Sequence, residues 1–440
     1  MNTVSPRRSA PVRPKVASLH YRLECLDRGT LHEEHSRGFA LANPDAAAPA
    51  LLRASYDEKR FLVHADEPGI FRFRSWLPVR RSFPGAGAPA AFRAEALARH
   101  LGMRELVPVF SGYWPERGAD LRSCTFKELE ALSVLARIPE TEERTLVVAS
   151  AGNTGRAFYQ AASRYGCRVV VVVPERALGS IWSTAPRSRD VRLVALRGEA
   201  DYSDAIALAD TIAALPGYYP EGGARNVARR DGMGTTLLAA AELLGDCPAH
   251  YVQAVGSGTG GIGAWEMSLR LLSSGFASRL ARLHLVQNEP FTPMTDAWLS
   301  GSRTLLPMEH ADALRRIDAL HSPVLSNRKP PYSITGGVYD ALCDTGGTMS
   351  AVSSEAAREA GELFERLEGC DLDPAAEVAL AGLMEGLRKG TIPRGEPVAL
   401  NLTGGGFRRL REVSEVREVA ADVTFESDEL TPEAAARKLE

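Results

Sequence analysis

Continuous apolar runs alternate with amphipathic segments through most of this 440-residue chain. Residues 145–150, 167–174 and 191–198 are apolar runs, two of them rich in valine, and a segment of helical periodicity follows the first and the last of them. Continuous rather than alternating apolar strands are typical of a parallel sheet covered by helices on both faces. The pattern therefore predicts an α/β protein built from repeated strand–turn–helix units.

The alternation of expected strands and helices continues on both sides of this region. Helices are expected at 91–102, 156–166, 178–186, 201–215, 234–245, 355–369 and 374–390, and further strands begin the segments 250–275, 282–290 and 397–406. Residues 69–83 start with alternating apolar and basic residues, which predicts a half-buried strand that leads to a loop.

The chain is long enough for more than one core. We expect a flexible basic arm at 1–18, an N-terminal module with a strand pair at 19–84, a core at 85–411, and a surface tail at 412–440. Within the core, a smaller subdomain is expected at about 135–235 and a larger one from the other segments.

Composition excludes several classes of protein. The chain is 45% hydrophobic and 24% charged with a formal net charge of -3, so neither nucleic acid nor a membrane is an expected partner. No apolar run is long enough to cross a bilayer, and the basic N-terminus lacks the apolar core of a secretory signal, so the cytoplasm is the expected location.

Six cysteines are scattered without a CxxC pair, which predicts reduced, buried thiols and neither a disulfide framework nor a metal site. Cys25 stands alone in the N-terminal module, where a zinc ribbon needs more ligands. Cys124 lies near Lys127, and packing explains it better than nucleophilic chemistry because no histidine is adjacent in sequence.

Three glycine-rich turns each follow an expected strand, where ligands of open α/β sheets bind. Residues 150–155 (SAGNTG) and 256–263 (GSGTGGIG) each open a helix, and exposed backbone N–H groups at a helix N-terminus bind anions. Residues 402–406 (LTGGG) place a threonine hydroxyl at a strand end. Each turn alone could also be a tight structural connection.

Lys127 begins an expected helix in the sequence TFKELEA. A lysine in this position is either a solvated surface group or a nucleophile that forms a Schiff base. The lysine by itself does not separate these two interpretations.

The four motifs together resemble, in type and order, those of fold type II pyridoxal-phosphate enzymes, the group that contains threonine synthase and O-acetylserine sulfhydrylase. The resemblance to the threonine synthase-like family runs from about His20 to about Arg411. Segments 110–131, 219–235, 285–298 and 329–342 look most like the cysteate-forming members of that family.

The resemblance implies two open, twisted, mostly parallel sheets with helices on both faces. It implies that Lys127 forms the internal aldimine, Asn153 binds the cofactor's 3'-hydroxyl and Thr403 faces the pyridine nitrogen. The cofactor phosphate would be bound by Gly256, Ser257, Gly258, Thr259 and Gly260, and the substrate carboxylate by Ser150, Ala151, Gly152 and Thr154.

The reaction implied is the conversion of O-phospho-L-serine and sulfite to L-cysteate and phosphate through an aminoacrylate. Both substrates are anions, and guanidinium groups suit them. The first candidates are Arg122, Arg225 and Arg229, and the further candidates are Arg117, Arg230 and Lys329.

Other functions stay open at this point. Threonine synthesis from O-phosphohomoserine, or β-replacement with another nucleophile, would use the same site. A catalytically silent binder has no need of Lys127, and a nicotinamide-dependent oxidoreductase lacks the acidic ribose partner after its glycine loop. A homodimer is the family expectation.

Overall fold

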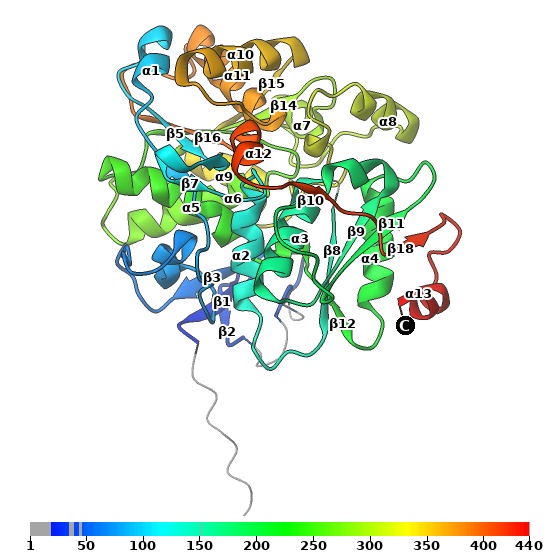
Figure 1. Cartoon of the computed structure of the whole chain (residues 1–440). Coiled ribbons are helices and arrows are strands. Elements are labelled where there is room, and N and C mark those ends of the chain that lie inside the picture. Colours follow the sequence, from blue (N-terminus) through cyan, green and yellow to red (C-terminus); the bar gives the residue numbers. More distant parts are fainter. Residues whose placement is uncertain (1–18, 35–38, 44–45, 151, 440) are drawn as a thin grey trace, which may run out of the picture.

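Two twisted sheets form the core of the computed structural model, which describes residues 19–34, 39–43, 46–150 and 152–439 (Figure 1). The expected arm at 1–18 lies outside these residues. The larger sheet has the order β15 (Thr348–Val352), β14 (Arg282–Asn288), β13 (His250–Ala254), β16 (Val398–Leu402), β5 (Leu106–Phe110) and β4 (Ala90–Ala91). Its strands pair in parallel except for β4, which runs antiparallel to β5.

The smaller sheet is parallel throughout. Its order is β12 (Tyr218–Pro220), β8 (Thr145–Ala149), β9 (Val169–Pro174), β11 (Val191–Leu196) and β18 (Val423–Phe425). Every residue of the valine-rich strand β9 is buried, as the continuous apolar run predicts. The fold class expected from the sequence is confirmed.

The last strand of this sheet corrects the expected tail at 412–440. β18 pairs with β11, and α13 (Pro432–Leu439) packs on α4 (Tyr202–Ala213). Phe425 is completely buried there, so this segment belongs to the smaller subdomain. The sequence gives little sign of it because the strand has three residues and pairs with a distant segment.

Helices cover the faces of both sheets (Figure 1). Besides α4 and α13, the helices in the described residues are α1 (Glu95–Leu101), α2 (Lys127–Arg137), α3 (Asn153–Tyr165), α5 (Val227–Leu244), α6 (Thr259–Ser273), α7 (Pro293–Leu299), α8 (His310–Asp318), α9 (Val338–Thr345), α10 (Ser354–Glu368), α11 (Pro374–Lys389) and α12 (Phe407–Val413).

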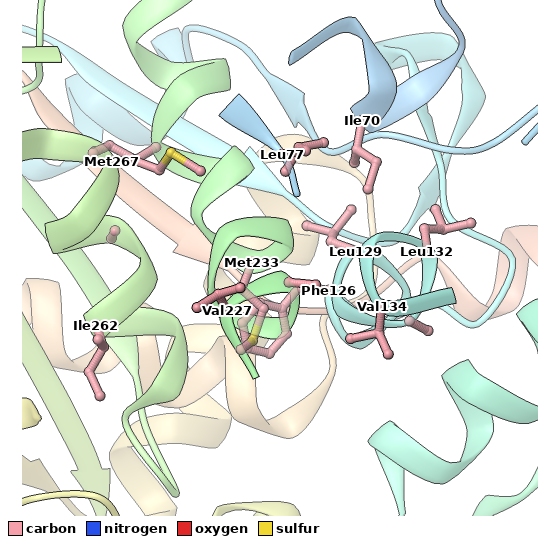
Figure 2. Close-up of a cluster of buried hydrophobic side chains, with 14 of the residues drawn as sticks. Ile70, Leu77, Phe126, Leu129, Leu132, Val134, Val227, Met233, Ile262 and Met267 are labelled. Carbon is pink, nitrogen blue, oxygen red and sulfur yellow. The ribbon is translucent and has the colours of Figure 1, made fainter. Parts of the chain in front are cut away.

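Helix α2 lies at the centre of the molecule. All of its residues except Lys127 are buried, and it packs on α3 and α5. Figure 2 shows Leu129 and Leu132 of α2 among apolar side chains of other elements, such as Ile70 and Met233. A helix buried on all sides must be held rigidly, because its side chains are close-packed in every direction.

The N-terminal module is a small antiparallel sheet of β1 (Tyr21–Cys25), β2 (Thr30–His32) and β3 (Leu52–Tyr56). It is fastened to the core by a buried ion pair between Glu34 and Arg137 and by a 2.5 Å hydrogen bond from Tyr56 to Asp231 of α5. The module therefore braces the two central helices, α2 and α5.

Two local predictions are wrong. Residues expected to form a strand within 69–83 form the 3-10 helix η1 (Gly69–Trp76), which buries Ile70, Phe71, Phe73 and Trp76. Their spacing also fits a helix with about three residues per turn. The helix expected at 178–186 is instead the end of the 3-10 helix η3 (Glu175–Ser180) followed by β10 (Trp182–Ser183), which pairs with β17 (Arg417–Glu418).

Short elements complete the fold. They are β6 (Tyr113–Trp114), β7 (Ala119–Asp120) and the 3-10 turns η2 (Pro115–Arg117), η4 (Gly223–Arg225) and η5 (Pro323–Leu325). Across the described ranges, no helix is long and apolar enough to cross a membrane. All six cysteines are unpaired, and among the residues described no group of three or more His, Cys, Asp or Glu side chains could hold a metal ion.

Candidate active site

A cavity opens where strands of the two sheets end. It is lined by Phe126 and Lys127, by residues of the loop after β8, by residues 253–260 at the end of β13 and in the loop that follows, by residues 324–327, and by Thr403 after β16. Ligands of open α/β folds bind at the carboxyl ends of the strands. The structure thus brings Lys127 and the three glycine-rich turns together, as the sequence predicts.

Lys127 is fixed by the turn that precedes it. The N–H of Phe126 donates to the carbonyl oxygen of Thr403 at 2.9 Å, and the N–H of Gly405 donates to that of Cys124 at 3.2 Å. Cys124 has a φ of 52°, a left-handed conformation that non-glycine residues rarely adopt. These bonds couple the lysine's turn to the third glycine-rich turn.

The Cys124 thiol is buried, and burial raises its pKa well above the ordinary value. A thiol in this state is a poor nucleophile because the thiolate is the reactive form. The structural interpretation of Cys124 is therefore the better one.

The amine of Lys127 faces three neighbours. Its Nζ lies 3.5 Å from Oε2 of Glu130, 3.7 Å from the sulfur of Met233 and 4.6 Å from the centre of the Phe126 ring. Burial lowers the pKa of this amine, Glu130 opposes the shift, and Arg229 adds to it. A lysine with a lowered pKa has more of the neutral, nucleophilic form at neutral pH.

Glu130 belongs to a buried charge network that the sequence interpretation missed. Its Oε1 accepts a 2.9 Å hydrogen bond from the Thr154 hydroxyl and lies 3.5 Å from Nη1 of Arg229. Arg229 in turn makes two hydrogen bonds to Glu221, at 2.9 and 2.6 Å. An acidic residue one turn after the lysine was the available signal, because residues three apart share a helix face.

The loop after β8 wraps around the Ser150 hydroxyl, which accepts hydrogen bonds from the N–H groups of Gly152 at 3.0 Å and Gly155 at 2.6 Å. Asn153 begins α3 and lines the cavity, as does Thr154. Ala151, a predicted carboxylate-binding residue, lies outside the described residues.

The loop after β13 leads into the N-terminus of α6. No hydrogen bond within the described ranges engages the backbone N–H groups of Gly256, Ser257, Gly258 and Gly260. A β-carbon at Gly258, whose φ is 78°, would lie 2.4 Å from a methyl group of Val338. The loop therefore needs glycine both for its conformation and for the close approach of α9.

Several lining residues had no sequence signal. Tyr202 and Gln253 line the cavity, and so do Val324, Leu325, Ser326 and Asn327 from the connection before α9. Gln253 accepts hydrogen bonds of 3.0 Å from both Tyr251 and Asn401, which orient it. Apart from Gln253, which stands just before the second glycine-rich turn, these residues come from segments without such turns.

Among the candidate cations, the structure brings Arg229 alone to the cavity wall together with Lys127, as judged from the described residues. Arg122 pairs with Asp120 at 2.9 Å and lies in a separate surface hollow. Arg225 is exposed at the end of η4, outside the cavity lining.

The remaining cations have structural partners or face solvent. Arg230 is completely buried and pairs with Glu266 at 3.1 Å. The guanidinium of Arg117 lies over the rings of Phe92 and Trp114. Lys329 is exposed.

Solved structures resemble the fold. A fungal L-serine ammonia-lyase from Rhizomucor miehei matches with a TM-score of 0.56 and 16% identity, covering 74% of this chain and 98% of that one. Maize serine racemase matches with a TM-score of 0.54 and 13% identity, covering 72% and 89%. At these identities the likeness shows the fold alone.

Sequence relatives are much closer. Cysteate synthase from Methanosarcina mazei is 46% identical over 93% of this chain and 98% of its own length. The enzyme of the same name from Methanocorpusculum labreanum is 45% identical over the same shares of the two chains. Residues 119–404 match the family described as pyridoxal-phosphate dependent enzymes. The chain therefore belongs to the cysteate synthase family of pyridoxal-phosphate-dependent enzymes.

Proposed function

We propose that this enzyme converts O-phospho-L-serine and sulfite to L-cysteate and phosphate. The observation that carries the proposal is the 46% identity to a cysteate synthase over 93% of the chain. In this reaction the Cβ–O bond to phosphate breaks, and a Cβ–S bond to sulfite forms. The α-proton leaves first and returns at the end, so the site must hold and move one proton.

The cavity's donors fit pyridoxal phosphate. The unengaged N–H groups of Gly256, Ser257, Gly258 and Gly260 at the N-terminus of α6 suit a phosphate. The side chains of Asn153 and Thr403 line the cavity and make no side-chain hydrogen bond within the described part of the chain, so they are free for the 3'-hydroxyl and the ring nitrogen. Lys127 would hold the cofactor covalently through Nζ.

When bound, the cofactor withdraws electrons from the substrate's Cα, which acidifies the α-proton and allows the β-substituent to leave. A threonine hydroxyl at the ring nitrogen carries no full charge, which suits elimination better than transamination. The amine of Lys127 would accept the α-proton as general base. Its lowered pKa keeps the neutral form available.

The substrate's carboxylate would lie at the start of α3. There the Ser150 hydroxyl, which accepts from two backbone N–H groups, keeps its own proton to donate to the carboxylate. The N-terminus of a 13-residue helix adds a favourable partial charge for an anion.

The phosphoryl group and sulfite need a different source of binding than Arg122 or Arg225, which lie outside the cavity. Arg229 lines the cavity, but its guanidinium is already bound by Glu221. We infer that the side-chain N–H groups of Asn327, which lines the cavity, contact these anions, whereas the Ser326 hydroxyl already donates its proton to the carbonyl oxygen of Pro323 at 2.6 Å. The homodimer and the cytoplasmic location remain predictions from the sequence.

The test is to incubate the purified protein, loaded with pyridoxal phosphate, with O-phospho-L-serine and sulfite and to identify the product by mass. L-cysteate with release of one phosphate is expected. Turnover of O-phosphohomoserine to threonine, without cysteate from the first pair, would instead assign threonine synthesis and contradict the proposal.

A further inference from the structure

Four charged side chains meet beneath the cavity, on the side of α2 and α5. Lys127 contacts Glu130, Glu130 contacts Arg229, and Arg229 is bound by Glu221. The side chain of Lys127 is 20% exposed, those of the other three 8% or less. Tyr202 of α4 is another titratable group near these four side chains, and burial raises the pKa of its hydroxyl.

The charges balance in one protonation state only. With Lys127 protonated, two cations face two carboxylates; with Lys127 neutral, one negative charge is in excess. Screening by water is weak at such sites, so this difference matters more than at the surface. Glu130 is the carboxylate in contact with the lysine, and it therefore favours the protonated amine.

Glu130 also controls the hydroxyl of Thr154. That hydroxyl donates its single proton to Oε1 of Glu130 at 2.9 Å. Toward the cavity it can then only accept a hydrogen bond. A substrate carboxylate has only acceptors to offer, so the Thr154 hydroxyl cannot bind it while this bond exists.

We propose that Glu130 is a positioning residue that serves as the counter-ion of Lys127 after the lysine has taken the α-proton, and that it withholds the Thr154 hydroxyl from the substrate's carboxylate. The role in turnover rests on the proposed function. The contacts between Glu130, Lys127 and Thr154 do not depend on which substrate is used.

The first experiment uses the full-length protein stripped of cofactor, with pyridoxal phosphate as the probe. Capture of pyridoxal phosphate by Lys127 is followed across a pH series, with borohydride reduction and intact mass as the readout. Glu130→Gln removes the charge that favours the ammonium form. The midpoint of capture is expected to move to lower pH by about one unit.

Glu128→Gln is the matched control. Glu128 is also a buried carboxylate of α2, but its side chain accepts a 2.6 Å hydrogen bond from the N–H of Ser123 and makes no ion pair with the amine of Lys127. Its variant should capture pyridoxal phosphate with the wild-type midpoint. An unchanged midpoint in Glu130→Gln, or an equal shift in both variants, would overturn the counter-ion role.

Thr154→Val tests the claim that Glu130 withholds the Thr154 hydroxyl from the substrate's carboxylate. This variant also provides a test if Glu130→Gln does not fold. A threonine that donates to Glu130 contributes little to substrate binding, so KM for O-phospho-L-serine should stay within about threefold of wild type. A tenfold or larger rise in KM would show that the hydroxyl binds the substrate. The capture experiment needs no turnover, so it stands even where cysteate is not the product.

Discussion

The N–H of Phe126 donates to the carbonyl oxygen of Thr403 across 2.9 Å, which joins the start of helix α2 to the end of strand β16. Lys127 is the next residue, so its position relative to Thr403 at the end of β16 is fixed. The two groups expected at opposite ends of the cofactor are thus connected by one backbone hydrogen bond rather than by a flexible loop.

Lys127→Ala should abolish activity by about a thousandfold or more, because it removes both the covalent anchor and the general base. Borohydride treatment should leave the variant without a covalent pyridoxyl group, as measured by intact mass. Lys389→Ala, at an exposed lysine that ends α11, is the control and should behave as wild type. Retained capture in Lys127→Ala would assign the anchor to another lysine.

Arg229→Ala should lower the free energy of unfolding by about 3–5 kcal/mol, because Glu221 and Glu130 would keep buried charges without their partner. The exposed Arg225, which ends the preceding turn η4, should tolerate alanine within about 0.5 kcal/mol. Urea unfolding of the two variants measures the difference. Equal stabilities would show that Arg229 does not carry the network.

Gly258→Ala should weaken binding of pyridoxal phosphate by about tenfold or more, equivalent to at least 1.4 kcal/mol. The new β-carbon would stand 2.4 Å from Val338 at a φ of 78°, so the loop must move. Gly275→Ala is the matched control, since its φ is 75° and nothing lies within 4 Å. Fluorescence titration with the cofactor would contradict the prediction if both variants bind alike.

Stability should fall in acid because of His284. Burial and the neighbouring His250, whose Nδ1 lies 2.9 Å from Nε2 of His284, lower the pKa of His284 from 6.5 to about 3. Between these values the unfolded chain binds a proton that the folded chain does not. The free energy of unfolding therefore drops by about 1.4 kcal/mol per pH unit as the pH falls from 6.5 toward 3.

His284→Gln should flatten this dependence, which denaturant unfolding at several pH values would measure. His100→Gln, at an exposed histidine of α1, should keep the wild-type slope. The same slope in His284→Gln and wild type would assign the acid sensitivity to other groups.

Phe425→Ala should destabilise the protein by about 3–5 kcal/mol, because the ring is completely buried between β18 and the rest of the smaller subdomain. Val413→Ala, at a side chain that is 64% exposed, should have little effect. The shift of the thermal midpoint compares the two. A small effect of Phe425→Ala would mean that β18 is dispensable.

The sequence predicted one site for Lys127 and the glycine-rich turns because the turns are local features placed where strands end, and the topology of parallel sheets brings strand ends together. Glu130 was missed because a carboxylate beside a lysine on a helix is usually a surface ion pair. Arg122 was proposed from its residue type, but its pairing with Asp120 depends on packing that no local pattern encodes.

The same reasoning explains the errors in the fold. Residues 69–76 have apolar spacing that fits a strand and a 3-10 helix equally well. The segment forms the 3-10 helix, in which four of its apolar side chains are buried. β18 was missed because three residues carry too little periodicity, and its partner β11 is far away in sequence.

The position of β18 has a consequence for biosynthesis. It completes the edge of the smaller sheet beside β11, yet it is synthesised long after β11 because it lies far along the chain from that strand. Until β18 has been made, this edge of β11 is unpaired, and unpaired strand edges promote aggregation of nascent chains. The smaller subdomain, which carries the start of α3, can therefore reach its final form only after β18 has been made, so its assembly depends on a segment distant in sequence from its other strands.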